Sequence, residues 1–314
     1  MNNELRRWVL GTPAAVAGDD GVVGLTAADL LIARGRAGLA VGLHEAMGTA
    51  VPKAGERVDI YLPAYRGKTF IPVLSWLVAT RLSSVHSNAV WHIDKQQGPN
   101  SVMNLLTGLG WKLDRERKGR ETLLSGWPPA DVILPEPRDF VAEIGAGSLR
   151  LAADYGVFSP GEVDMGTELL LQVALRGPAV EVLADIGIGY GPLAIGLIRN
   201  GIARRGVATD IDCVALWLAQ RNAETNQVPL EVVCSPDSST VASTRLTVCN
   251  VPTHINAEQT QALMGGLLRR ARQGRLLAVV HASLETRYAR YFVDSGVPVT
   301  RHAGATHVVL DSAY

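Results

Sequence analysis

The stretch from Val182 to Gly191 constrains the fold more than any other part of this 314-residue chain. An apolar run closes on Asp185, three glycines follow at every second position, and a helical pattern starts at Pro192. Glycine lets the backbone turn sharply and leaves room for a ligand, because it has no Cβ. The free N–H groups at the start of the next helix point to the same place. The stretch therefore predicts a strand, a ligand-binding turn and a helix.

Two classes of turn compete for this stretch. A dinucleotide site has the pattern G-x-G-x-x-G, and its third glycine would fall at Pro192. The observed spacing is Gly187, Gly189 and Gly191, with Asp185 ahead of them, which is the pattern of class I S-adenosylmethionine (SAM) methyltransferases. In that interpretation Asp185 helps to orient the methionine ammonium group, and the glycines admit the adenosine and methionine parts. A glycine turn of some other α/β protein is the alternative that the motif alone leaves open.

The second half of the chain alternates strand and helix patterns, which is typical of a doubly wound α/β sheet. The expected strands are 182–185, 206–210, 230–234, 245–249 and 276–280, followed by 297–300 and 307–310 as an antiparallel hairpin. Ligands of such sheets bind beyond the carboxyl ends of the strands. A second glycine-rich stretch, 143–147, lies between two strand-like segments and therefore predicts a β-hairpin.

The first half predicts a smaller α/β unit. Strands are expected at 58–62 and 89–93, and helices at 70–78 and 100–109. The first of these strands is followed by Pro63 and not by a glycine loop, so no nucleotide is expected there in the usual way. Proline-rich residues at 127–137 mark the predicted boundary. We expect one domain at 1–135 and a second at 136–314.

Composition limits the class of partner. The chain has 30 Lys and Arg against 30 Asp and Glu, and zero net charge does not favour nucleic acid as a main partner, although a local patch can suffice. The basic segments 112–120 and 269–275 are expected as solvated helix ends or loops, or as an RNA contact. No apolar run approaches the ~20 residues of a membrane span. Three widely spaced cysteines predict reduced core residues of a cytoplasmic protein, and seven histidines without paired spacing predict no metal site.

Polar residues follow the expected strands. Asp210 ends the second strand, where a carboxylate can accept both ribose hydroxyls of an adenosine. Asp237 follows the third strand and is a candidate for the adenine amino group, with an ordinary turn acid as the alternative. Asn250 ends the fourth strand and opens the segment Asn-Val-Pro-Thr-His at 250–254.

Together these segments resemble the methyltransferase small-domain family, in particular bacterial ribosomal RNA guanine-N2 methyltransferases of the small-subunit methyltransferase C type. The resemblance is carried by 156–159 (Gly-Val-Phe-Ser), 164–170 (Asp-Met-Gly-Thr-Glu-Leu-Leu), 185–191, 210, 222–226 and 250–254. It implies a class I SAM-methyltransferase fold, Rossmann-like and doubly wound with a terminal antiparallel hairpin. A smaller degenerate α/β domain without the cofactor turn would precede it. It also implies SAM as cofactor, ribosomal RNA as partner, and Phe158 and Thr167 as further cofactor contacts.

The resemblance also implies how an amine would be held. An exocyclic amine is a weak nucleophile because its lone pair is delocalised into the ring. The amide oxygen of Asn250 and the carbonyl of Val251 would accept its two hydrogens and aim the lone pair at the SAM methyl group, while Pro252 stiffens the loop. The related enzymes carry Asn-Pro-Pro-Phe, and Thr253 cannot stack on a base, which removes a contact worth ~1–3 kcal/mol. His254 either orients the substrate or is a plain loop residue.

Three functions follow from these observations. The leading one is SAM-dependent N-methylation of a nucleobase amino group in ribosomal RNA, with no metal and no covalent enzyme intermediate. The second keeps the enzyme but changes the acceptor to a small molecule such as a specialised metabolite, which zero net charge and Thr253 favour. The third is a non-catalytic RNA-binding relative that has kept the fold.

Overall fold

The computed structural model describes residues 6–11, 16–48, 57–63, 68–83, 87–253 and 255–312. The chain divides into two compact units. Unit 1 comprises 1–137 with 155–157, and unit 2 comprises 138–154 with 158–314. Each unit is built around its own seven-stranded sheet, and a separate two-stranded hairpin belongs to unit 2.

The sheet of unit 1 has the order β3-β2-β1-β4-β5-β7-β6, with β7 antiparallel to both of its neighbours. Its strands are β1 (Arg7–Leu10), β2 (Asp20–Gly24), β3 (Leu39–Gly42), β4 (Arg57–Tyr61), β5 (Asn88–Asp94), β6 (Lys112–Lys118) and β7 (Glu121–Trp127). Its α-helices are α1 (Ala27–Ala33), α2 (Leu43–Gly48), α3 (Ile71–Leu77) and α4 (Pro99–Gly108), with short helical turns at Lys68–Phe70, Val78–Leu82 and Lys95–Gln97. The fully buried Trp8, Phe70 and Trp91 lie in its core.

Unit 1 departs from the sequence expectation at both ends. The first strand is β1, not the segment at 58–62, and residues 11–19 follow it where the glycine turn and a helix follow the first strand of unit 2. The basic segment 112–120 was expected as a loop or helix end, which is wrong. Most of it is the exposed edge strand β6, which pairs with β7 through the turn around Gly119. A charged edge strand is a common protection against pairing with other chains.

The sheet of unit 2 has the order β12-β11-β10-β13-β14-β16-β15, which is the same permutation as in unit 1. Its strands are β10 (Val180–Ile186), β11 (Ala203–Asp210), β12 (Leu230–Cys234), β13 (Leu246–Asn250), β14 (Arg275–His281), β15 (Thr300–Ala303) and β16 (His307–Ser312). The first five are parallel, and β16 lies antiparallel to β14 and β15. The predicted doubly wound sheet with a terminal antiparallel hairpin is therefore confirmed.

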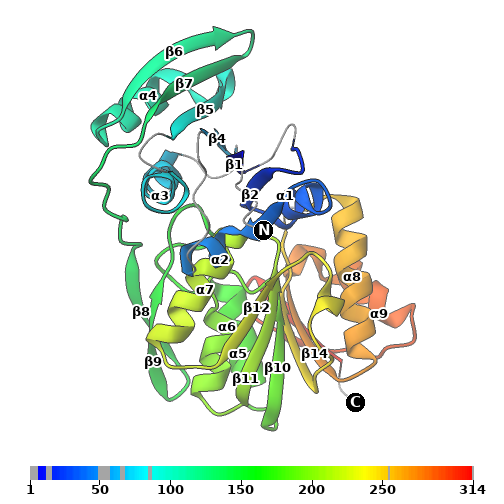
Figure 1. Cartoon of the computed structure of the whole chain (residues 1–314). Coiled ribbons are helices and arrows are strands. Elements are labelled where there is room, and N and C mark those ends of the chain that lie inside the picture. The colour runs from blue at the N-terminus through cyan, green and yellow to red at the C-terminus, as the bar shows by residue number, and fades with distance from the viewer. Residues whose placement is uncertain are drawn as a thin grey trace. The chain divides into compact units, whose positions relative to one another are not determined.

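Helices cover both faces of this sheet. One set is α5 (Met165–Ala174), α6 (Pro192–Arg199) and α7 (Cys213–Thr225), and the other is α8 (Ala257–Ala271) and α9 (Glu285–Val293), on the opposite side of the sheet (Figure 1). Short helical turns lie at Ser238–Thr240 and Ala282–Leu284. In the described part of the chain, no helix has the length and apolar character that a membrane crossing requires.

The second glycine-rich stretch forms the predicted hairpin, from β8 (Asp139–Ile144) and β9 (Gly147–Ala152). Asn222 of α7 and Asn226, the residue that follows this helix, hold β9. Asn222 accepts the N–H of Ala152 at 2.7 Å and donates to its carbonyl at 2.9 Å, and Asn226 makes the same pair of bonds to Arg150 at 3.1 and 2.8 Å. Positions four apart lie on one face of a helix, so the two side chains meet alternate residues of the strand.

Candidate functional site

The glycine turn lies at the carboxyl end of β10 and has the backbone that only glycine adopts easily. The φ angles of Gly187, Gly189 and Gly191 are +75°, +59° and +95°. A Cβ on Gly191 would lie 2.8 Å from Ile195, whereas at Gly187 and Gly189 no heavy atom of the described residues lies within 4 Å of such a Cβ. The first two glycines therefore border open space, and the third allows α6 to pack closely.

Asp185 is fully buried and faces the start of α6. Its Oδ2 accepts the N–H of Ala194 at 3.2 Å, and its Oδ1 has no hydrogen-bond partner among the described residues. Burial raises the pKa of Asp185 to about 8, the negative charge of Asp210 adds to the rise, and the Ala194 bond opposes it. The carboxyl group has no exposed surface and ties the glycine turn to α6, and its contact with a ligand ammonium group stays a prediction.

Asp210 ends β11 and also supports the turn. Its Oδ2 accepts the N–H of Gly189 at 2.8 Å, and its Oδ1 accepts the N–H of Asp212 at 2.9 Å. Asp212 in turn caps α7 by accepting the N–H of Val214 at 2.9 Å. The carboxylate predicted to face a ribose thus lies directly beside the glycine turn, and it is partly exposed.

Asp237 lies after β12, where it caps the turn Ser238–Thr240. Its carboxylate accepts the N–H and the hydroxyl of Ser239 at 2.9 and 2.6 Å, and these bonds, with nearby arginines, lower its pKa. The alternative of an ordinary turn acid describes these contacts. Arg269 lies 3.8 Å from it in an exposed ion pair.

Arg270 of α8 holds the loop that contains Asp237. It is only 5% exposed, although the segment 269–275 was expected to be solvated, and for this residue that expectation is wrong. Its guanidinium donates to the carbonyls of Ser238, of Val241 at 2.7 Å and of Ala242 at 3.1 Å. Arg270 thus fixes the backbone of the loop that follows Asp237.

Asn250 ends β13, and the rest of the site fixes its amide group. Its Nδ2 donates to both carboxylate oxygens of Asp164 at 3.2 Å and lies 3.0 Å from Oγ1 of Thr167. A carboxylate only accepts hydrogen bonds, so the amide nitrogen must face Asp164. Asp164 is held by capping α5, where it accepts the N–H groups of Gly166 and Thr167 at 3.0 and 3.3 Å. The Oδ1 of Asn250 consequently points away from Asp164.

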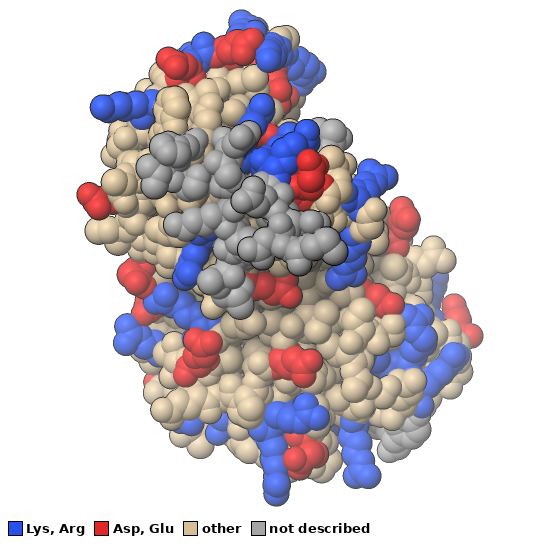
Figure 2. All heavy atoms as spheres, in the orientation of Figure 1, with Lys and Arg blue, Asp and Glu red and all other residues tan. Residues whose placement is uncertain are grey.

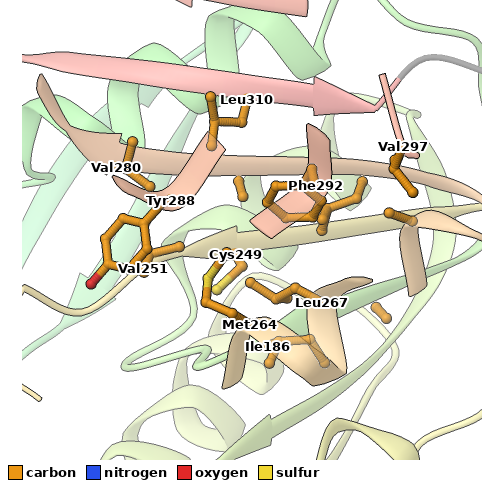
Figure 3. Close-up of a cluster of buried hydrophobic side chains, with 14 of the residues drawn as sticks. Ile186, Cys249, Val251, Met264, Leu267, Val280, Tyr288, Phe292, Val297 and Leu310 are labelled. Carbon is orange, nitrogen blue, oxygen red and sulfur yellow. The ribbon is translucent and has the colours of Figure 1, made fainter. Parts of the chain in front are cut away.

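Val251 follows Asn250 and fixes the loop by a hydrogen bond and by burial. Its N–H donates to the carbonyl of Val279 at 3.0 Å, a bond that proline cannot make. Its side chain is 3% exposed and packs in the cluster between the sheet, α8 and α9, near Tyr288 (Figure 3). Pro252 and Thr253 are exposed, and His254 lies outside the described residues.

The remaining expected cofactor contacts differ in their surroundings. Phe158 is 73% exposed, whereas Thr167 is 3% exposed and lies in the Asn250 network. Nearby, the buried Tyr190 donates its hydroxyl hydrogen to the carbonyl of Glu162 at 2.9 Å, which ties the glycine turn to the segment before α5.

The structure adds Asp164 and Arg270 to the predicted site residues. Asp164 was part of the Asp-x-Gly-Thr motif without a role of its own, and the Asx cap that it forms was the available signal. The sequence carried no signal for Arg270, because a buried arginine looks like its solvated neighbours. Among the described residues, no group of three His, Cys, Asp or Glu side chains could hold a metal ion. On the face shown in Figure 2, basic and acidic side chains are interspersed.

Comparisons with known proteins agree with this geometry. Residues 148–294 match the Methyltransferase small domain family. The chain is 29% identical over 224 residues to ribosomal RNA small subunit methyltransferase C of Hahella chejuensis, covering 68% of this chain and 63% of the relative. The protein of the same name from Pasteurella multocida is 32% identical over 127 residues, covering 40% of this chain and 38% of the relative. This chain thus matches less than two thirds of the length of either relative.

A solved structure extends the likeness to the whole chain. It is the T. thermophilus 16S rRNA N2 G1207 methyltransferase (RsmC) in complex with AdoMet and guanosine, with a TM-score of 0.73 and 20% identity. The match covers 98% of this chain and 87% of that one. The sheet of unit 2 with its glycine turn thus has the class I SAM-methyltransferase fold.

Proposed function

We propose that this protein is a SAM-dependent methyltransferase whose acceptor is the exocyclic amino group of a nucleobase, of the guanine-N2 type, in ribosomal RNA. The observation that carries the proposal is the fixed amide of Asn250. Because Asp164 and Thr167 engage its Nδ2, its Oδ1 is presented as a hydrogen-bond acceptor at the carboxyl end of β13. The names of the relatives, ribosomal RNA small subunit methyltransferase C, support the same class of acceptor.

The residues divide between two halves of the sheet edge. On the side of β10, β11 and β12, the open space beside Gly187 and Gly189 and the partly exposed Asp210 would hold SAM. Asp185 and Gly191 would act through the shape of the turn, and Asp237, Phe158 and Thr167 complete the proposed cofactor site. SAM supplies an electrophilic methyl group whose bond to sulfur breaks with both electrons staying on sulfur.

On the side of β13, Asn250 and the backbone of 251–252 would position the amine. The Oδ1 of Asn250 and the carbonyl oxygen of Val251 can accept hydrogen bonds from the two N–H groups of the amine. These bonds raise the electron density on the amine nitrogen and set its direction of attack. The new C–N bond forms from the nitrogen lone pair, and the extra proton on nitrogen then passes to water. Pro252, Thr253 and His254 are proposed to line the acceptor side of the loop.

Unit 1 shares the strand order of unit 2, but only residues 11–19 separate β1 from β2, whereas residues 187–202 separate β10 from β11. We propose that unit 1 is a degenerate copy that does not hold SAM, and that unit 2 carries the catalysis. We also propose a cytoplasmic location, since ribosomal RNA is methylated there and the three buried cysteines form no disulfide.

The test uses tritiated SAM with deproteinised ribosomal RNA, ribosomal subunits or a metabolite extract. Asn250→Ala should abolish transfer to RNA while leaving SAM binding by calorimetry unchanged. Asn256→Ala, which removes an asparagine that only caps α8, is the matched control and should retain transfer. Equal transfer by wild type and Asn250→Ala would contradict the assignment.

A small-molecule acceptor is the second candidate, favoured by the exposed Thr253, which offers no stacking surface. Label only in the metabolite fraction would select it over RNA. No measurable SAM binding by the wild-type chain would instead favour a non-catalytic RNA-binding protein.

A further inference from the structure

Two histidines meet at the carboxyl end of β14. His281 is the last residue of β14, His307 is the first of β16, and the two are paired in the antiparallel ladder. Their rings lie edge to face, with centroids 5.3 Å apart and an interplanar angle of 85°. Both side chains are partly exposed, so the pair offers flat ring surface at this edge of the sheet.

This pair lies on the acceptor side of the proposed site. Asn250 is level with Val279 in the β13–β14 ladder, and His281 lies two residues further along β14. At ~3.3 Å per residue this places it roughly 7 Å further along the strand direction. The imidazole of His307 and the carboxylate of Asp164, the residue that orients Asn250, both lie beside Gly166. A Cβ added at Gly166 would lie 3.3 Å from Nε2 of His307 and 3.1 Å from Oδ1 of Asp164.

Gly166 therefore has a steric role in the Asp-Met-Gly-Thr segment. The same added Cβ would lie only 3.0 Å from Cδ2 of His307. Because glycine leaves this point empty, the imidazole can pack against the first turn of α5 beside the Asn250 network. The ring position is also fixed by Thr306, whose hydroxyl oxygen lies 2.9 Å from Nδ1 of His307.

A cavity of about 220 Å³ lies against His307. Its other walls are Met165, Glu168, Leu169 and Gln172 of α5 and the loop 304–306. This volume is below the ~300–1,000 Å³ of sites for drug-sized ligands, so it suits one flat ring system and not a whole nucleotide. Met165 is 52% exposed and offers apolar contact. The exposed Glu168 offers a carboxylate acceptor for a ring N–H group of a purine.

Ser283 engages one ring nitrogen of His281. The Nδ1 lies 2.7 Å from the Ser283 hydroxyl oxygen and 3.3 Å from its backbone nitrogen. The other ring nitrogen, Nε2, is thus the one proposed to contact a purine. Single-stranded RNA bases are recognised by stacking on flat side chains, histidine among them.

We propose that His307, backed by His281, is the stacking wall for the purine that accepts the methyl group, and that it replaces the aromatic residue absent at Thr253. The proposal rests on the function proposed above. The stacking wall comes from β16 and not from the loop after β13. The base is proposed to lie in the cavity at α5, with its amino group directed toward the Asn250 amide. The purine is extruded from RNA before it enters, because the ring face must be free to stack.

The experiment compares His307→Ala, His307→Phe and the control His302→Ala, which alters another partly exposed histidine on the neighbouring strand β15. Transfer from tritiated SAM to deproteinised ribosomal RNA gives kcat and KM for RNA, calorimetry gives the SAM Kd, and scanning calorimetry gives Tm. His307→Ala should lower kcat/KM for RNA roughly ten-fold or more, as loss of one stacked base does. Its SAM Kd should stay within two-fold of wild type. His307→Phe should restore kcat/KM to within a few-fold, and His302→Ala should match wild type.

Unchanged kcat/KM in His307→Ala would overturn the proposal. Loss of SAM affinity in parallel with activity, or failure of phenylalanine to restore activity with Tm unchanged, would overturn it as well. Wild-type transfer is measured first, and absence of label in RNA would contradict the proposed function itself. Label that is insensitive to His307→Ala would contradict only the stacking wall.

Discussion

The buried carboxyl of Asp185 makes stability depend on pH in a defined direction. Its pKa is about 8 in the folded chain, against 3.8 for a solvated aspartate. Between these values the folded state keeps a proton that the unfolded state has released, so stability is full below pH 4 and falls as pH rises to 8. The slope is about 1.4 kcal/mol per pH unit for one proton. The loss between pH 5 and pH 8 is therefore about 4 kcal/mol.

Asp185→Asn removes this loss, because asparagine resembles the protonated carboxyl and its Oδ1 can still accept the Ala194 N–H. The stability of the variant relative to wild type should increase by about 4 kcal/mol from pH 5 to pH 8. For a domain of 150–250 residues about 4 kcal/mol corresponds to ~8–16 °C in Tm. Scanning calorimetry of the full chain without SAM, from pH 5 to pH 8.5, measures the difference.

Asp237→Asn is the matched control. Its carboxyl is exposed and its pKa is lowered, so it is ionised in both states over this range and should add no pH dependence above pH 5. Parallel Tm curves for wild type and Asp185→Asn would refute the reasoning. The same variant also tests the predicted contact between Asp185 and the ligand ammonium group. If the carboxylate contacted the ligand ammonium directly, the SAM Kd would rise at least ten-fold, whereas support of the turn by a single N–H bond predicts a smaller change.

Two further predictions concern residues that position the site. Arg270→Met should weaken SAM binding by about ten-fold in calorimetry, since three loop carbonyls after Asp237 lose their donor. The control Arg269→Met, which removes only an exposed ion pair, should change SAM binding less than two-fold. Equal effects of the two variants would contradict the role of Arg270 in fixing this loop. Asn222→Ala should lower the free energy of unfolding of unit 2 by about 2–4 kcal/mol in urea titrations, because backbone groups of β9 and the Tyr190 carbonyl lose buried partners; the exposed Thr225→Ala on the same helix is the control, and a similar small loss in both variants would count against this role.

The sequence carried the parts of the fold that depend on local chemistry. Three glycines at alternate positions predicted the turn after β10, because each adopts a positive φ that other residues resist. The alternation of elements in the second half predicted the parallel sheet. The strands β1, β2 and β3 escaped prediction because they are four or five residues long and lie in a region rich in Ala and Gly, where neither period is sustained.

The candidate site was less visible because its bonds are non-local. Asp164 and Asn250 are 86 positions apart, and their pairing depends on α5 passing the end of β13. No periodicity signals such a contact. The burial of Asp185 and Arg270 was hidden for a similar reason, since a charged residue in a sequence is ordinarily taken as solvated. Both are tertiary effects of packing one element on another.

The segment 250–254 departs from the expected Asn-Pro-Pro-Phe pattern, and non-local contacts compensate for one of these differences. Replacing a proline by Val251 would loosen the loop after Asn250 if nothing else held it, because proline restricts its own backbone. Here the Val251 N–H adds a rung to the β13–β14 ladder, and its side chain is anchored in the core below α9. Rigidity is thus retained by hydrogen bonding and burial. At Thr253 the loop itself offers no such substitute, because the exposed side chain has no flat surface. The proposed recognition of a base would then come from another element of the same edge, such as the end of β14 and the start of β16, where the partly exposed rings of His281 and His307 lie.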